Sequence, residues 1–354
     1  MAVFEFVIGL VLVGLVLHDV FNTVILPRPS PARYRPAGVL TRWSWRGWRR
    51  YAERQADPDR REQRLGIFAP AVVIVLLGLW MVMLIGGFGL LFHALAEQIA
   101  PVPPDLGTAM YFAAVSLLTL GYGDFVPTHG LSRLVAIAAA GAGLGIVALT
   151  ITYLFSLYAS FQRREVQIVT LDARAGAPPS AVALLETCAS FSDRNAELQR
   201  IFEDWERWSA EVLESHLAYP ILMFFRSTHD HESWVSAVGA LLDAATLVIT
   251  GIEDGPSGQA RAMRGLGAHL VEDIARFFRF PIRADAGPGI ERAEFDDVRV
   301  RLARAGYRLV PDGDAAWAEF ARLRAGYAAA LNALAAYLDV PPAQWIGDRS
   351  YVFH

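Results

Sequence analysis

Three long apolar stretches constrain this chain more than any other feature of its sequence. They cover residues 2–26, 67–93 and 131–160, and each is long enough, as a helix, to cross about 30 Å of hydrocarbon. A mean hydropathy of +0.32 is too apolar for an ordinary soluble protein of 354 residues. We therefore expect a membrane protein with three transmembrane helices.

The loop between the first two stretches sets the expected orientation. Residues 27–65 carry eleven arginines against four acidic residues, a net charge of 11 − 4 = +7. Positive loops next to membrane spans stay in the cytoplasm, so we expect the amino terminus outside and the C-terminal region inside. Arginines and aromatic residues alternate around one predicted helix of this loop, which indicates a helix lying at the lipid surface against anionic headgroups. Its expected lipid-facing residues are Arg42, Trp43, Trp45, Arg46, Trp48, Arg49 and Arg50.

Regularly spaced arginines can also form a voltage sensor, but this run has no continuous apolar stretch long enough to span. The first apolar stretch has its own polar residues, with Asp19, Asn22 and Thr23 on one helical face. Polar groups inside a membrane are costly and mark either an internal partner or a pathway. Two interpretations stay open: a structural contact with neighbouring helices, or a part in ion conduction.

A short segment between the last two apolar stretches has the composition of an ion-binding loop. Residues 119–124 read Thr-Leu-Gly-Tyr-Gly-Asp, and their two glycines allow backbone dihedrals that a helix or strand excludes. Such a backbone can point successive carbonyl oxygens to one side and replace the water shell of a cation. Residues 108–118 fit a short helix that re-enters the membrane and directs its negative end towards this segment. Glu97, Asp105 and Asp124 make the outer surface attractive to cations.

This segment resembles the selectivity filter of the potassium-channel pore family, with leucine where valine or isoleucine is more usual. The resemblance covers roughly residues 66–160, and the leading helix and helical tail resemble certain bacterial channels only loosely. It implies a homotetramer in which the carbonyls of Thr119, Leu120, Gly121 and Tyr122 and the Thr119 hydroxyl hold K⁺. Gly123 and Asp124 would complete the outer end of the filter.

The same resemblance assigns roles to residues on both sides of the filter. Tyr111 and Phe112 fall where an aromatic cuff would pack around Tyr122, and Val115 stands where the family often has a carboxylate that reaches the filter aspartate. Gly143 falls at a hinge position, although glycines here can equally serve close helix packing. Val147, Ile151 and Phe155 repeat every four residues and would line the cavity and its inner gate.

Residues 161–354 show the helical period, and we expect an all-α cytoplasmic regulatory domain. No Gly-x-Gly-x-x-Gly follows a strand, so a dinucleotide-binding domain is not expected. His216, His229 and His231 offer metal ligands, but the stretch around the last two also fits a helix start. The single cysteine, Cys188, fits a small buried residue of a reducing compartment. No catalytic spacing or phosphate loop suggests an enzyme.

The expected fold is an all-α membrane protein: three transmembrane helices, a re-entrant pore helix with its filter, and an all-α cytoplasmic domain. The expected domains are residues 1–26, 27–65, 66–160 and 161–354. The expected function is a gated potassium-selective channel in the inner membrane of a bacterium, without an organic cofactor or a nucleic-acid partner. The alternatives are a weakly selective cation channel and a membrane-anchored sensor whose working part is the tail. The regulatory ligand is not identified by the sequence.

Overall fold

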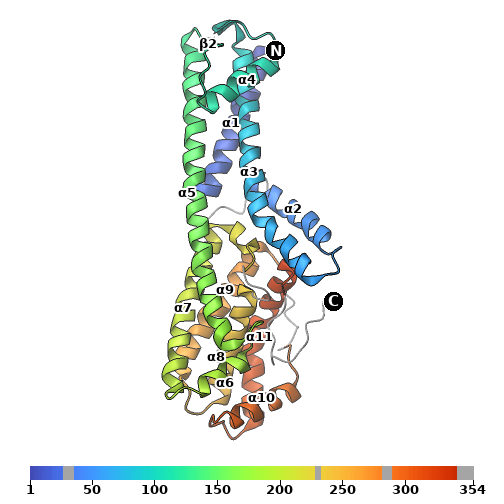
Figure 1. Cartoon of the computed structure of the whole chain (residues 1–354), viewed down its shortest axis with the longest axis vertical. Coiled ribbons are helices and arrows are strands. Elements are labelled where there is room, and N and C mark those ends of the chain that lie inside the picture. Colours follow the sequence, from blue (N-terminus) through green and yellow to red (C-terminus); the bar gives the residue numbers. More distant parts are fainter. Residues whose placement is uncertain (27–35, 228–232, 281–288, 341–354) are drawn as a thin grey trace. The chain divides into compact units, whose positions relative to one another are not determined.

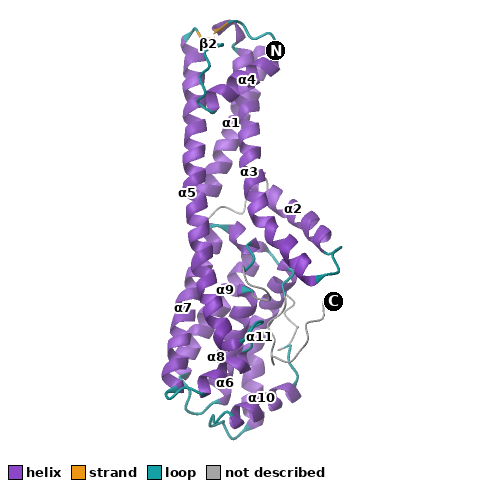
Figure 2. Ribbon diagram, viewed as in Figure 1, coloured by secondary structure: helices purple, strands orange, loops and turns teal. Residues whose placement is uncertain are grey.

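The computed structural model describes residues 1–26, 36–227, 233–280 and 289–340, and almost all of its regular structure is helical (Figures 1 and 2). The expected all-α membrane protein is confirmed. The chain forms two compact units, and two long helices, α3 (Pro58–Ala94) and α5 (Gly130–Ala175), each contribute residues to both. The first unit comprises Met1–Arg54 and Ile67–Tyr158, and the second Gln55–Gly66 and Ala159–His354.

The first unit contains the apolar helices of the sequence. Helix α1 (Ala2–Val20) continues into a π-helical turn, η1 (Phe21–Ile25), and packs against α3 (Figure 1). The two helices approach closely at glycines, since a Cβ added to Gly9 would lie 2.7 Å from the carbonyl oxygen of Gly87. Small residues at a membrane interface allow such an approach and increase van der Waals contact. The two helices also share a polar contact, in which His93 Nδ1 lies 2.8 Å from Glu5 Oε2.

Asp19 has a structural role in this unit. Its side chain is fully buried, and Oδ2 accepts hydrogen bonds from the Trp80 indole at 2.9 Å and from the Ala37 backbone N–H at 3.1 Å. Ala37 lies in the first turn of α2 (Pro36–Ala52), so the carboxylate also sits at the positive end of a helix dipole. Asp19 thus joins α1, α2 and α3, which favours the structural interpretation over ion conduction.

The loop after α3 is more ordered than its prolines suggest. A 3-10 turn, η2 (Ala96–Gln98), leads into β1 (Ile99–Ala100), which pairs antiparallel with β2 (Val126–Pro127). The Thr128 backbone N–H donates to the Gln98 carbonyl at 2.8 Å and extends this pairing. The short ladder therefore closes the loop that contains helix α4 (Leu106–Leu117) and the segment after it.

The second unit is a helical bundle, as the helical period of the tail predicts. The loop after α5 ends at Ser180, whose side chain caps the next helix. Asp193 caps the helix that begins at Arg194. The elements are α6 (Ala181–Ala189), α7 (Arg194–Ala218), η3 (Pro220–Phe224), α8 (Trp234–Gly251), α9 (Ser257–Phe278), α10 (Arg292–Arg304) and α11 (Gly313–Leu338).

Helix α8 forms the centre of this bundle. Within the described part of the chain, four helices are long and apolar enough to cross a membrane, and α8 is the fourth beside α1, α3 and α5. However, 94% of its apolar window is buried by protein, whereas 22–39% is buried in the other three. Its Asp243 pairs with Arg324 at 2.9 Å and accepts a hydrogen bond from the Tyr327 hydroxyl at 2.6 Å, both from α11. Helix α8 is therefore a core helix.

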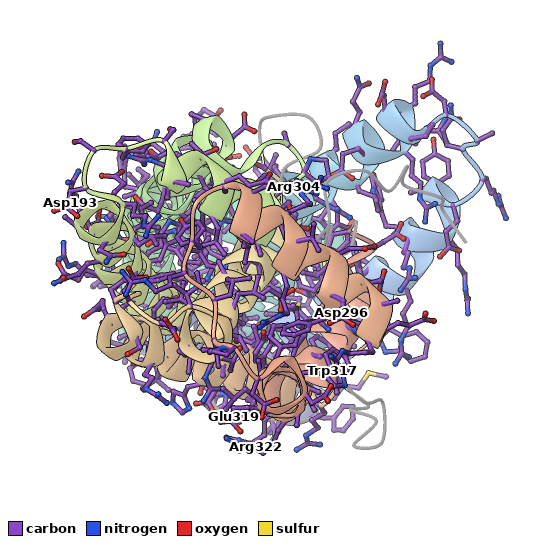
Figure 3. The ribbon with its side chains drawn as sticks, turned by 90° about the horizontal axis from the view of Figure 1, so that it is seen from below. Asp193, Asp296, Arg304, Trp317, Glu319 and Arg322 are labelled. Carbon is purple, nitrogen blue, oxygen red and sulfur yellow. The ribbon has the colours of Figure 1, made fainter. Side chains whose placement is uncertain are left out.

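Some charged pairs of the bundle lie at its surface. Glu319 and Arg322 of α11 pair at 2.7 Å at the edge of the unit, where both side chains are exposed (Figure 3). Exposed pairs of this kind contribute about 0.2–1 kcal/mol. The bundle is therefore held by its apolar core rather than by these surface charges.

Candidate ion-conducting site

Helix α4 begins and ends with defined backbone contacts. The Asp105 side chain accepts a 2.7 Å hydrogen bond from the Thr108 backbone N–H, which caps the helix and lowers the pKa of this carboxyl group. At the other end, the Thr119 N–H donates to the Ser116 carbonyl at 3.1 Å and the Leu120 N–H donates to the Val115 carbonyl at 2.9 Å. The segment that follows is thus held directly on the carboxyl end of α4.

The backbone of residues 119–124 alternates between left-handed and other conformations. The φ angles are +54° at Thr119, +62° at Gly121 and +79° at Gly123. Glycine adopts such angles freely, whereas a β-branched threonine does so at a cost in strain. This alternation at every second residue is the geometry that a row of carbonyls directed to one side requires.

The chain by itself leaves this segment uncovered. Every residue from 119 to 124 is exposed, with Leu120 at 51% and Tyr122 at 67%. A Cβ added at Gly121 or Gly123 would meet no atom within 4 Å. Irregular backbone at membrane depth is tolerated only where protein buries it or where it lines a wet path. The segment consequently has the exposure of a pore lining or of a subunit interface.

The aromatic residues of α4 pack behind the segment. Phe112 is buried, with its ring centroid 4.5 Å from that of Phe92 and 6.2 Å from that of Phe125, and the Tyr111 ring lies 6.4 Å from Phe125. The predicted contact of both rings with Tyr122 stays a prediction.

Val115 is buried and offers no carboxylate, but the Tyr111 hydroxyl lies near enough to the Asp124 carboxylate to interact with it electrostatically. The sequence did not predict this interaction. The hydroxyl group of Tyr111 could have indicated it, but the sequence assigned this residue only to ring packing.

Helix α5 meets α4 at a glycine. A Cβ built on Gly143 would lie 1.8 Å from the Leu117 carbonyl oxygen, a distance that no side chain can occupy. The packing interpretation of Gly143 is therefore favoured over the hinge. Further along α5 lie the residues predicted to line a cavity. Their side chains are exposed in the single chain: Val147 at 46%, Ile151 at 51% and Phe155 at 75%. Their apolar stripe is free to line a cavity or to meet another copy.

The predicted lipid-facing helix needs one correction. In α2, Trp45 is only 2% exposed and packs edge-on against Phe68 at 4.9 Å, so its ring faces protein and not lipid. Trp48 also lies against Phe68, at 6.2 Å, and is half-buried. By contrast, Trp43 is 69% exposed, with the Arg46 guanidinium 5.7 Å from its ring centroid. Arg42, Arg46 and Arg50 are exposed, whereas Arg49 is half-buried and pairs with Glu53.

Of the three histidines that the sequence offers as metal ligands, the structure describes His216, and its contacts are not those of a metal ligand. His216 is buried, and its Nε2 lies 3.2 Å from the Arg164 guanidinium. Arginine can only donate, so Nε2 accepts and Nδ1 donates to the Val212 carbonyl at 2.8 Å. Burial and the neighbouring cation lower the pKa of His216 to about 3. His229 and His231 lie outside the described residues, and no group of three or more metal-binding side chains occurs within the described ones.

Cys188 is the buried residue that its sequence context suggests. Its thiol is fully enclosed, and burial raises its pKa to about 12. A thiol with such a pKa is not a nucleophile at neutral pH.

Three apolar helices, a short helix that ends on an exposed irregular segment, and a helical bundle define an all-α membrane protein. Residues 71–160 match the family described as ion channel. The expected resemblance to the potassium-channel pore family is therefore confirmed for this stretch.

Several curated proteins are similar to this chain. The uncharacterized membrane protein YdjJ of Bacillus subtilis is 26% identical over 226 residues, which cover 62% of this chain and 63% of YdjJ. The human delayed-rectifier potassium channel regulatory subunit KCNS2 is 38% identical over 72 residues, 20% of this chain and 14% of that subunit. Probable potassium channel protein 2 of Methanocaldococcus jannaschii is 44% identical over 57 residues, 16% of each chain. The similarity thus spans less than two thirds of each relative, and no solved structure matches the chain.

Proposed function

We propose that this chain is one subunit of a potassium-selective channel that conducts K⁺ passively across the membrane. The observation that carries the proposal is the alternation of positive φ angles at Thr119, Gly121 and Gly123 in an exposed segment at the carboxyl end of α4. The similarity to an archaeal protein described as a probable potassium channel supports the same choice of ion.

The chemistry of conduction would be supplied by the backbone. Carbonyl oxygens of Thr119, Leu120, Gly121 and Tyr122 replace the hydration shell of K⁺, and the Thr119 hydroxyl serves the inner end. The carboxyl end of α4 places partial negative charge near the waiting ion. Asp124, near the Tyr111 hydroxyl, would give the outer end a negative charge that concentrates cations. K⁺ is the transported ion, and neither an organic cofactor nor a catalytic step is required.

The assembly would be a homotetramer. One chain provides one strand of carbonyls, and the exposed filter segment needs further copies to enclose an ion. The exposed stripe of Val147, Ile151 and Phe155 would then face the central cavity, and a ring of Phe155 side chains could close it by excluding water. The helical tail would regulate this gate.

Anionic lipid is the proposed membrane partner of α2. Arg42, Arg46 and Arg50 are exposed beside Trp43, while Trp45 fixes the opposite side of the helix to α3. Cations and an exposed aromatic ring on one side suit the headgroup region of an anionic leaflet. This arrangement agrees with a cytoplasmic position of α2, an amino terminus outside, and the inner membrane of a bacterium.

The decisive experiment is conduction by the purified full chain in liposomes. With potassium and sodium on opposite sides, the reversal potential should lie close to the potassium equilibrium potential. A reversal potential near zero would replace the proposal with the weakly selective cation channel. If the protein passes no ion across bilayers of several lipid compositions, the membrane-anchored sensor becomes the better description.

A further inference from the structure

Residues 220–227, here called the strap, contact two helices that are far apart in the sequence. The strap consists of η3 and the three residues after it. It belongs to the second unit together with the start of α3, up to Gly66, and the part of α5 after Tyr158. Each of these helix segments continues without a break into the first unit. The contacts of the strap with both segments lie within the second unit.

On one side, the strap is bound by a buried arginine of α5. Arg164 is 2% exposed, and its guanidinium donates to the carbonyls of Leu222 at 3.0 Å and Phe225 at 2.7 Å. The same guanidinium contacts Glu165 at 2.9 Å and 3.0 Å, and Glu165 accepts a hydrogen bond from the Ser227 hydroxyl. Losing a partner from such a buried charged network costs more than losing a surface pair.

On the other side, the strap binds the first turns of α3. Arg226 follows Phe225 directly, and its Nη1 lies 3.2 Å from both carboxylate oxygens of Glu62. Its Nη2 donates to the carbonyls of Leu338 and Asp339 at the end of α11. Arg61 of α3 pairs with Asp339 as well. Consecutive strap residues thus hold α5 and α3.

We propose that the strap couples the cytoplasmic end of the inner helix α5 to the start of the outer helix α3 in the same subunit, with Glu62, Arg226 and Ser227 as positioning residues of the gate. The inference rests on the proposed channel function and adds a mechanical link to it. Pro70 supports a coupling at this point of α3. It has no N–H to donate to the Gly66 carbonyl, so one helical hydrogen bond is missing at the residue where the part of α3 in the second unit ends.

A link in series has a property that separate local contacts do not have. Weakening the link at either end loosens the same connection, so weakening both ends changes gating by less than the sum of the two single effects. Independent contacts would instead give additive changes. Glu62→Ala removes the Arg226 ion pair at the α3 end of the link. Ser227→Ala removes one hydrogen bond at the α5 end and leaves the Arg164 guanidinium bonded to the strap carbonyls.

The test measures open probability and reversal potential of the full chain in liposomes for both variants and their combination. Each single variant should shift the open–closed equilibrium by about threefold in the same direction, as expected for the loss of one polar contact. The double variant should shift it by clearly less than the two single effects combined, with an unchanged reversal potential. Glu186→Ala is the control, because it breaks a comparable pair with Arg301 away from the strap. Additive effects, opposite directions or unchanged gating would overturn the coupling.

Hydrogen–deuterium exchange provides a readout that does not depend on conduction. Ser227→Ala should raise exchange in residues 58–66 as well as in the strap, although the hydrogen bond it removes is to α5. Unchanged exchange in residues 58–66 would overturn the strap. If Ser227→Ala raises exchange in residues 58–66 but the wild-type chain passes no ion, the channel proposal is overturned instead.

Discussion

Gly143 of α5 lies so close to the Leu117 carbonyl oxygen of α4 that a methyl group on Gly143 would be placed 1.8 Å from it. The Leu117 carbonyl is one of the last of the short helix that carries residues 119–124. Residues 119–124 can therefore take this position against α5 only because residue 143 is a glycine and has no side chain. Packing of backbone against backbone leaves no flexible group that could move aside.

Gly143→Ala should consequently destabilise the protein by about 3 kcal/mol or more, because the clash is with backbone. Thermal unfolding of the full chain in detergent measures this. Gly141→Ala and Gly145→Ala are the controls, since an added Cβ meets no atom within 4 Å at either position. A hinge role would show the reverse result: normal stability of Gly143→Ala with altered gating.

Gly121→Ala should abolish potassium-selective flux for a different reason. Its φ of +62° strains any residue with a Cβ by about 1–2 kcal/mol, although no atom of the chain stands in the way. The strain should alter the carbonyl row rather than unfold the protein. Liposome flux and reversal potentials test this, with Gly130→Ala, an open position, as the control. Retained selectivity in Gly121→Ala would show that these carbonyls do not select the ion.

Asp19→Ala should lower stability without changing the permeability ratio. The substitution leaves the Trp80 indole and the Ala37 amide without their acceptor, and unmade buried hydrogen bonds cost about 1–3 kcal/mol each. A double-mutant cycle with Trp80→Phe isolates the pair. Ion conduction through Asp19 would instead appear as an altered permeability ratio in protein of normal stability.

Acid should destabilise the tail through His216. Its pKa of about 3 in the folded chain lies below the ordinary value of 6.5, so below pH 6.5 the unfolded chain binds a proton that the folded chain excludes. The His216 contribution is complete above pH 6.5 and falls by up to ~1.4 kcal/mol per pH unit as the pH decreases towards 3.

The slope of unfolding free energy against pH tests this. His216→Gln keeps an acceptor for Arg164 and a donor for Val212 but binds no proton, so its slope between pH 6.5 and 4 should be smaller. Equal slopes for the wild type and His216→Gln would contradict the assignment.

The sequence predicts those features of the fold that local patterns determine. Long apolar runs locate α1, α3 and α5, and glycines at 121 and 123 anticipate the positive φ angles found there. Both predictions work because length, hydropathy and the absence of a Cβ act on the chain locally. Thr119 also has a positive φ although it is not a glycine, and its residue type does not predict this angle.

Tertiary partners are what the sequence does not supply. Helical periodicity places Trp45 and Trp48 on a helix surface, but it does not tell whether Phe68 or lipid will cover them. Similarly, the charges of residues 55–66 read as part of a basic loop, whereas Arg61 and Glu62 pair with Asp339 and Arg226. These partners are 164 or more residues away in the sequence.

The burial of α8 has a consequence for biosynthesis. As α8 leaves the ribosome it is an 18-residue helix with a mean hydropathy of 1.6, which the insertion machinery can accept as a further span. Insertion would move every later residue to the opposite side of the membrane. Asp243, at the middle of α8, opposes this, because a carboxylate at the centre of a span costs about 2.5–3.5 kcal/mol. The aspartate that binds Arg324 and Tyr327 in the finished bundle therefore also makes membrane insertion of α8 less favourable.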